Sequence, residues 1–139
     1  MGQLSKRAES ILRMQKFNRF ACPHCKEPMQ VEKDGRLQCE NRHSFDVAKQ
    51  GYVYMLAKPV NSMYSKDLFD ARHHIITSGL YDRVQQKIAE LIRVDNAKIL
   101  DTGCGEGSHL ARICAQLDGA VGVGIDIAKE AIIAAAKFN

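Results

Sequence analysis

Three cysteines and one histidine in the first third of the chain have the spacing of a metal-binding site. The pairs are Cys22-Pro-His-Cys25 and Cys39-Glu-Asn-Arg-His43, separated by thirteen residues. Zinc takes four thiolate or imidazole ligands in a tetrahedron, so this pattern predicts a structural zinc site without an open coordination position. His24 competes with His43 as the fourth ligand. Because His24 lies between the two thiolates of the first pair, we favour His43.

A glycine-rich loop carries the second pattern. It reads Asp101-Thr102-Gly103-Cys104-Gly105-Glu106-Gly107. The dinucleotide fingerprint G-x-G-x-x-G would need glycine at position 108, where Ser108 stands. No Lys or Arg lies between Lys98 and Arg112, so a pyrophosphate would meet carboxylates without a counter-charge. A sulfonium cation joined to an adenosine and an amino acid suits this acidic loop better.

Asp126 extends this cofactor prediction. It follows the apolar run Val121–Ile125, nineteen residues after Gly107. An acid at the end of the second strand of a nucleotide-binding fold accepts hydrogen bonds from ribose hydroxyls. The loop and Asp126 together therefore predict S-adenosylmethionine as the cofactor.

The elements that must position these residues follow from local patterns. Residues 29–38 resemble a hairpin with Asp34-Gly35 at its turn, which would bring the two metal-binding pairs together. Val53 and Met55 alternate with Tyr52, Tyr54 and Leu56, and this alternation predicts a strand at residues 52–56 that closes the module. Asp67 is the expected cap of a helix reaching Ser78, and a second helix is expected from Tyr81 to Arg93, with an apolar face. Residues 98–137 read strand, helix, strand, helix, the opening of a doubly wound sheet.

The formal charge of +4 arises in the N-terminal segment, because residues 1–20 alone sum to +4. This segment is either a basic arm that contacts phosphates or a surface helix that packs an apolar stripe. The chain has neither a long apolar run nor a signal-peptide pattern, so we expect a cytoplasmic protein that does not bind a membrane. In that compartment its five cysteines are ligands or buried thiols.

The combined motifs resemble one family. They are the cysteine pairs, the stretch His43-Ser-Phe-Asp-Val-Ala-Lys-Gln-Gly-Tyr52, Ala71-Arg72 with Gly79-Leu80-Tyr81, and the glycine loop. Together they resemble the N-terminal half of bacterial 23S rRNA (guanine-N1)-methyltransferases of the RlmA type. The resemblance implies zinc ligands at Cys22, Cys25, Cys39 and His43. It also implies cofactor contacts at Tyr81, Gly105 and Glu106 within a site comprising Asp101, Gly103, Gly107 and Asp126.

The resulting expectation is an α/β protein in four parts. These are a basic N-terminal arm or helix (1–19), a zinc-ribbon-like β module (20–57), a linker (58–67), and the N-terminal part of a class I methyltransferase domain (68–139). The expected partner is a 23S rRNA hairpin, and a homodimer stays an open alternative. Because the sheet would contain only two strands, we expect a fragment that is inactive alone. No catalytic base is assigned. The competing hypothesis is a non-catalytic zinc-ribbon module that binds nucleic acid and carries a vestigial nucleotide fold.

Overall fold

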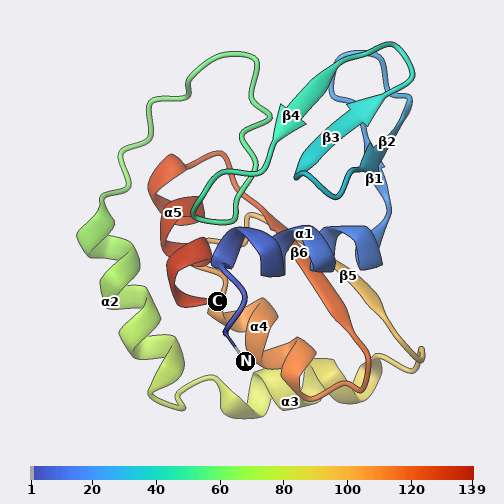
Figure 1. The fold of residues 1–139 in the computed structure, drawn as a ribbon. Coiled ribbons are helices and arrows are strands. Elements are labelled where there is room, and N and C mark those ends of the chain that lie inside the picture. The colour runs from blue at the N-terminus through green and yellow to red at the C-terminus, as the bar shows by residue number, and fades with distance from the viewer. Residues whose placement is uncertain (1) are drawn as a thin grey trace. The chain divides into compact units, whose positions relative to one another are not determined.

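The computed structural model describes residues 2–139 and divides into two compact units, with the boundary between Lys58 and Pro59. The first unit contains a helix followed by a four-stranded antiparallel sheet whose strands are neighbours in sequence order (Figure 1). Its elements are α1 (Lys6–Phe17), β1 (Phe20–Ala21), β2 (Pro28–Val31), β3 (Arg36–Cys39) and β4 (Ser44–Asp46). The predicted hairpin is present as β2 and β3, with Gln30 opposite Gln38. Gly35 closes its turn at a φ of 90°, a conformation that favours glycine.

Helix α1 is an integral part of the first unit. The hydroxyl of Ser5 caps it by accepting a hydrogen bond from the Ala8 amide at 3.1 Å. Ile11 is buried in the core, and the Arg7 guanidinium donates to the carbonyls of Val47 and Asp34 at 2.8 and 2.6 Å. The segment is therefore a helix, and of its apolar side chains Ile11 is packed in the core whereas Leu4 and Leu12 are 56% and 54% exposed.

The predicted strand at residues 52–56 is wrong. Within this stretch only Val53 pairs, in an isolated bridge with Val47. A turn at Gly51, whose amide donates to the Ala48 carbonyl, carries the chain back past Val47. Residues 54–56 belong to no strand, so the antiparallel pairing that starts at this bridge does not continue along β4.

The second unit starts with two helices and continues as the expected strand–helix–strand–helix. Its elements are α2 (Lys66–Thr77), α3 (Asp82–Leu91), β5 (Lys98–Thr102), α4 (Ser108–Ala115), β6 (Val121–Ile125) and α5 (Lys129–Phe138). Strands β5 and β6 are parallel, with Asp101 opposite Gly124, and α4 is the crossover between them. Their C-terminal ends therefore lie at one edge of the strand pair, where the glycine loop begins.

Two details of the helices differ from the sequence predictions. The cap of α2 is Ser65, whose hydroxyl accepts from the Leu68 amide at 3.3 Å, whereas Asp67 lies in the first turn. There its carboxylate still interacts favourably with the helix dipole. Along α3, the expected apolar face is exposed, and the buried residues are Gln85 and Ala89. No helix in residues 2–139 combines the length and apolar character needed to cross a bilayer.

Two glycines in β6 allow the crossover helix and the loop to approach this strand. A Cβ at Gly122 would lie 2.9 Å from Leu110 and Cys114, and one at Gly124 would lie 2.6 Å from the Cys104 sulfur. Neither glycine has a positive φ. Close packing, rather than backbone conformation, therefore requires glycine at both positions.

Substitution of Gly124 tests this packing. We expect Gly124→Ala to lower the free energy of unfolding of the second unit by about 1–3 kcal/mol, because the new methyl group overpacks against Cys104. Denaturant unfolding measures the change. Gly2→Ala is the control, because nothing lies within 4 Å of its Cβ position. An unchanged midpoint for Gly124→Ala would contradict this explanation.

Candidate metal centre and cofactor pocket

The four predicted metal ligands converge in the first unit. The ligand atoms of Cys22, Cys25, Cys39 and His43 all lie within 4.8 Å of one another. The Cys25 and Cys39 sulfurs are 3.7 Å apart, and Nδ1 of His43 lies 3.4 Å from the Cys22 sulfur and 3.5 Å from the Cys39 sulfur. A zinc tetrahedron with bonds of about 2.3 Å to sulfur and 2.0–2.1 Å to nitrogen spaces these atoms by about 3.8 and 3.6 Å. The donor set and its spacing therefore fit zinc.

Two similar turns present the ligand pairs. In the first, the Lys26 amide donates to the Cys22 carbonyl, and in the second the Arg42 amide donates to the Cys39 carbonyl. Lys26 and Arg42 both adopt the left-handed conformation, with φ values of 67° and 65°. Neither residue is glycine, so the sequence did not signal these turns. The resulting curvature directs both members of each pair to one point.

His24 is not part of this ligand group. Its ring instead stacks on Phe45, with centroids 5.8 Å apart and an interplanar angle of 18°.

Hydrogen bonds from the Asn41 side chain and the Glu27 backbone lower the pKa of the Cys25 thiol to about 6. Above this pH the thiolate, the form that binds metal, predominates at Cys25.

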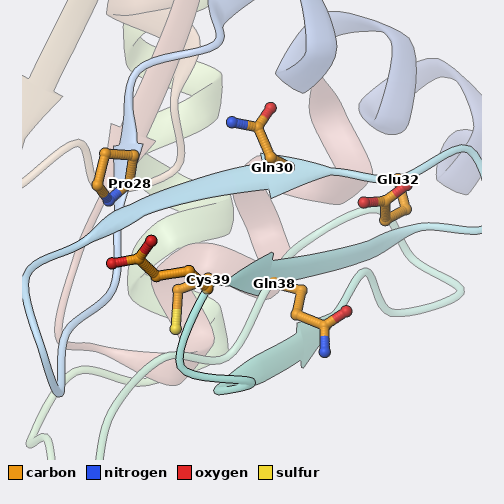
Figure 2. A pocket seen from close by; sticks show the side chains of 6 residues that line it. Pro28, Gln30, Glu32, Gln38 and Cys39 are labelled. Atoms are coloured by element: carbon orange, nitrogen blue, oxygen red, sulfur yellow. The ribbon is translucent and has the colours of Figure 1, made fainter.

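A surface hollow of about 360 Å³ adjoins the metal ligands (Figure 2). It is lined by Pro28, Gln30, Glu32, Gln38, Cys39 and Glu40. Its charged side chains are both carboxylates, which repel phosphate groups. The hollow is therefore not a site for an RNA backbone.

A second cavity, of about 280 Å³, lies at the glycine loop. It is lined by Arg72, Ile75, Ile76, Tyr81, Gly103, Cys104, Gly105, Glu106 and His109. The cavity thus brings together four of the predicted cofactor residues, namely Tyr81, Gly103, Gly105 and Glu106. Asp101, Gly107 and Asp126 are not among its lining residues. Ile75, Ile76 and His109 are absent from the sequence predictions, and Arg72 appears there only in the motif Ala71-Arg72, without a role. All four residues lie on helices whose rotation only the fold determines.

The loop glycines have different roles. Gly103 has a φ of 76°, and nothing lies within 4 Å of its Cβ position, so its backbone is open to a ligand. Gly107, at a φ of 81°, instead faces α5, because a Cβ there would lie 3.0 Å from the Asn139 amide and 3.2 Å from Ala135. Gly107 is therefore required for helix packing.

Most backbone amides of the glycine loop donate hydrogen bonds to acceptors within the protein. Gly103 and Cys104 both donate to the Ile125 carbonyl, and Gly107 donates to the Cys104 carbonyl. The Gly105 and Ser108 amides donate to the carboxylates of Asp126 and Glu106, respectively. A phosphate-binding loop needs amides that point at the anion. This loop lacks such a cradle, which agrees with its acidic character.

Asp126 connects the end of β6 to the glycine loop. One carboxylate oxygen accepts from the Gly105 amide at 2.9 Å, and the other accepts from the Ala128 amide at 2.8 Å. The carboxylate is half-buried, and each of its oxygens has a second lone pair. Asp126 therefore holds the loop in place and retains the capacity to accept a hydroxyl.

The buried carboxylate of Glu106 has hydrogen-bond partners at Ser108 and His73. Its side chain accepts hydrogen bonds from the Ser108 amide and hydroxyl. Nδ1 of His73 lies 2.8 Å from both the Glu106 carboxylate and the Ser108 oxygen. Because a carboxylate only accepts, the arrangement is favourable when Nδ1 carries the proton. The His73 ring also stacks on Phe138, with centroids 3.8 Å apart.

A chain of two hydrogen bonds, from Arg112 through Gln85, orients His109 in the cavity wall. The Arg112 guanidinium donates to the Gln85 amide oxygen at 3.0 Å, which orients that amide. The Gln85 amide nitrogen then lies 2.9 Å from Nδ1 of His109, which accepts its hydrogen. The neutral His109 ring therefore carries its proton on Nε2. Its ring lies edge-on to Tyr81, at 4.9 Å.

Cys104 is not a nucleophile in this site. Burial, followed by the nearby charges of Asp126 and Asp101, raises the pKa of its thiol to about 12. The thiolate is thus scarce at neutral pH. The same negative surroundings would stabilise a bound cation.

Alanine variants of the two neighbouring histidines test the metal centre. We expect His43→Ala to lower zinc affinity and to unfold the first unit, because zinc binding contributes folding free energy in so small a module. We expect His24→Ala to retain its metal. Zinc content and circular dichroism measure both effects, and equal zinc loss in the two variants would contradict the ligand assignment.

The loop network is tested by His73→Ala. Without His73, the buried Glu106 loses a donor, so we expect a loss of about 1–3 kcal/mol in the opening free energy of the loop. Hydrogen exchange of the Ser108 amide reports this opening. His73→Asn, which restores a donor, should recover part of the loss. The exposed His74 provides the matched control His74→Ala, and equal effects at both positions would refute the network.

Comparison with known proteins shows which proteins this chain is similar to. Residues 20–66 match the RlmA N-terminal zinc-ribbon family. The chain is 40% identical, over 131 residues, to a Bacillus subtilis protein provisionally named 23S rRNA (guanine-N(1)-)-methyltransferase YxjB, covering 87% of this chain and 46% of that protein. It is 36% identical, over 124 residues, to the 23S rRNA (guanine(748)-N(1))-methyltransferase of Streptomyces fradiae, covering 85% and 44% of the two chains.

The match therefore spans about half the length of these relatives. It includes both the zinc ribbon and residues beyond it. The resemblance identified from the sequence motifs is confirmed: the chain carries the RlmA-type zinc ribbon and is similar to 23S rRNA (guanine-N1)-methyltransferases over most of its own length.

Proposed function

We propose that this chain is part of a cytoplasmic, S-adenosylmethionine-dependent enzyme that methylates N1 of a guanine in a 23S rRNA hairpin. The observation that carries the proposal is the cavity formed by Tyr81 and the acidic glycine loop. It occurs in a chain similar to rRNA guanine-N1 methyltransferases. The loop's engaged amides and nearby carboxylates suit a cationic ligand and disfavour a phosphate.

The chemistry of the target restricts the mechanism. N1 of guanine lies on the Watson–Crick edge, so the target base must be unpaired or flipped out of its stack. S-adenosylmethionine supplies the methyl group, and the protein mainly aligns the two reactants. N1 also has to lose a proton, which calls for a base or for stabilisation of charge on O6. No residue in the described part of the chain is assigned to that step.

In this proposal the residues of the second unit bind and orient the cofactor. Gly103 and Gly105 allow it to approach the backbone, and Asp126 accepts from its ribose. Tyr81 contributes an aromatic wall. Glu106 acts indirectly, since its carboxylate is buried against Ser108 and His73 and holds the loop.

The first unit would bind RNA. Lys6, Arg13 and Lys16 are exposed on its helix, and the exposed Arg19 follows the helix, whereas Arg7 is half-buried and bonded within the unit. Exposed basic side chains contact phosphates without reading sequence, so the affinity for RNA should fall with salt. The zinc centre would keep the sheet folded beneath this helix.

We also propose that the 139-residue chain is inactive by itself. Leu100 and Ile125, on the two strands at the loop, are 55% and 49% exposed. Neither side chain lines either of the two cavities described above, so both apolar surfaces are left uncovered within residues 2–139. Methylation of rRNA by this chain alone would contradict this part of the proposal.

Titration calorimetry with S-adenosylmethionine tests the cofactor assignment. We expect the protein to bind, and we expect Asp126→Asn to bind on the order of tenfold more weakly, because a charged acceptor for the ribose is lost. The exposed Asp118 provides the control variant Asp118→Asn, which should bind like the unaltered protein.

The alternative function is a non-catalytic zinc module that binds nucleic acid. It is favoured by the first unit, which has its own core and metal centre. Absence of heat at millimolar S-adenosylmethionine, together with salt-dependent binding of an rRNA hairpin, would support this alternative over the enzyme.

A further inference from the structure

Arg72 is the cationic side chain in the wall of the loop cavity. It comes from α2, and its guanidinium carbon lies 5.5 Å from the ring centre of Tyr64 and 5.6 Å from that of Phe69. Such cation–π contacts hold a guanidinium in place without using its N–H donors. Phe69 itself is 1% exposed, so one of the two rings is firmly fixed.

No carboxylate in residues 2–139 forms an ion pair with Arg72. Arg112, the other arginine close to this region, is bonded to Asp82 at 2.6 Å and to Gln85 at 3.0 Å. The exposed guanidinium of Arg72 therefore has N–H donors that no carboxylate of the described residues engages. Arginine in this state binds a carboxylate through two parallel hydrogen bonds.

The position of Arg72 relates it to the glycine loop. A Cβ built on Gly105 would lie 4.0 Å from the Phe69 ring, the same ring over which the guanidinium sits. The Phe69 ring thus lies next to both the Arg72 guanidinium and the glycine loop. A ligand held along the loop can present an anionic group to Arg72.

We propose that Arg72 binds the carboxylate of the cofactor's amino-acid tail, an inference that rests on the proposed function. S-adenosylmethionine carries one carboxylate among otherwise cationic or neutral groups. The acidic loop favours the cationic groups, and Arg72 provides the opposite charge for the carboxylate. Arg72 is then a determinant of specificity for a cofactor with an intact amino-acid tail.

An RNA phosphate is the competing ligand for this arginine. A phosphate placed in the cavity would approach the carboxylates around Cys104. These carboxylates already raise the pKa of the Cys104 thiol, so they disfavour a negative charge at this position. A zwitterionic tail, with its ammonium next to its carboxylate, avoids that repulsion. The cavity therefore favours the cofactor carboxylate.

The experiment compares two ligands that differ in one group. S-adenosylmethionine and its decarboxylated analogue are titrated into the protein, into Arg72→Gln and into the control Arg83→Gln. Arg83 is exposed and does not line the cavity. We expect Arg72→Gln to weaken S-adenosylmethionine binding by about 10- to 100-fold, the value for a hydrogen bond to a charged group. Binding of the analogue should change by less than about threefold.

The same titrations contain the outcomes that overturn the inference. If Arg72→Gln weakens the binding of both ligands equally, or of neither, Arg72 does not bind the carboxylate. The proposed cofactor site is not affected by that result. Weaker binding of an rRNA hairpin with unchanged cofactor binding assigns Arg72 to a phosphate. If the unaltered protein binds neither cofactor ligand, the proposed function fails together with this inference. Thermal unfolding of each variant confirms that the loss of the two ring contacts has not unfolded it.

Discussion

The second unit depends on a single buried charge. Glu106 is 2% exposed, and a carboxylate removed from water is tolerated only when hydrogen-bond donors surround it. Those donors come from Ser108 at the start of α4 and from His73 in α2. The Asn139 side chain, at the end of α5, also donates to the Glu106 backbone carbonyl at 2.7 Å. Through its carboxylate and its backbone carbonyl together, Glu106 therefore links three helices to the glycine loop.

The first unit satisfies a different requirement. It is small, and its buried core consists of few side chains around the sheet. A module of this size buries little apolar surface, so its stability is marginal and a metal centre adds folding free energy. Three of its metal ligands also adjoin or belong to this core, so the metal centre and the apolar core stabilise the same strands. This coupling explains why the metal ligands come from the two turns of an antiparallel sheet.

The glycine loop shows that similar glycine-rich sequences can differ in how their backbone amides are used. In many nucleotide-binding folds, glycine-rich turns expose amides to a phosphate. Here the loop amides donate to Ile125, Asp126 and Glu106, so the turn is held by the protein's own acceptors. What remains at the surface is an open backbone at Gly103 next to negative charge. A proposed cationic cofactor agrees with this arrangement on electrostatic grounds.

Sequence alone determined the features that depend on local pattern. The spacing of the cysteine pairs predicted the ligand cluster, the Asp34-Gly35 turn predicted the hairpin, and residues 98–137 predicted the alternating strands and helices. Tertiary structure alone decided which side chains from distant helices reach the loop. His73 and His74 are equivalent by sequence, yet helix rotation directs only His73 to Glu106. Arg72 likewise lines the cavity because α2 packs against α4 and α5, and the sequence pattern of α2 does not specify that packing.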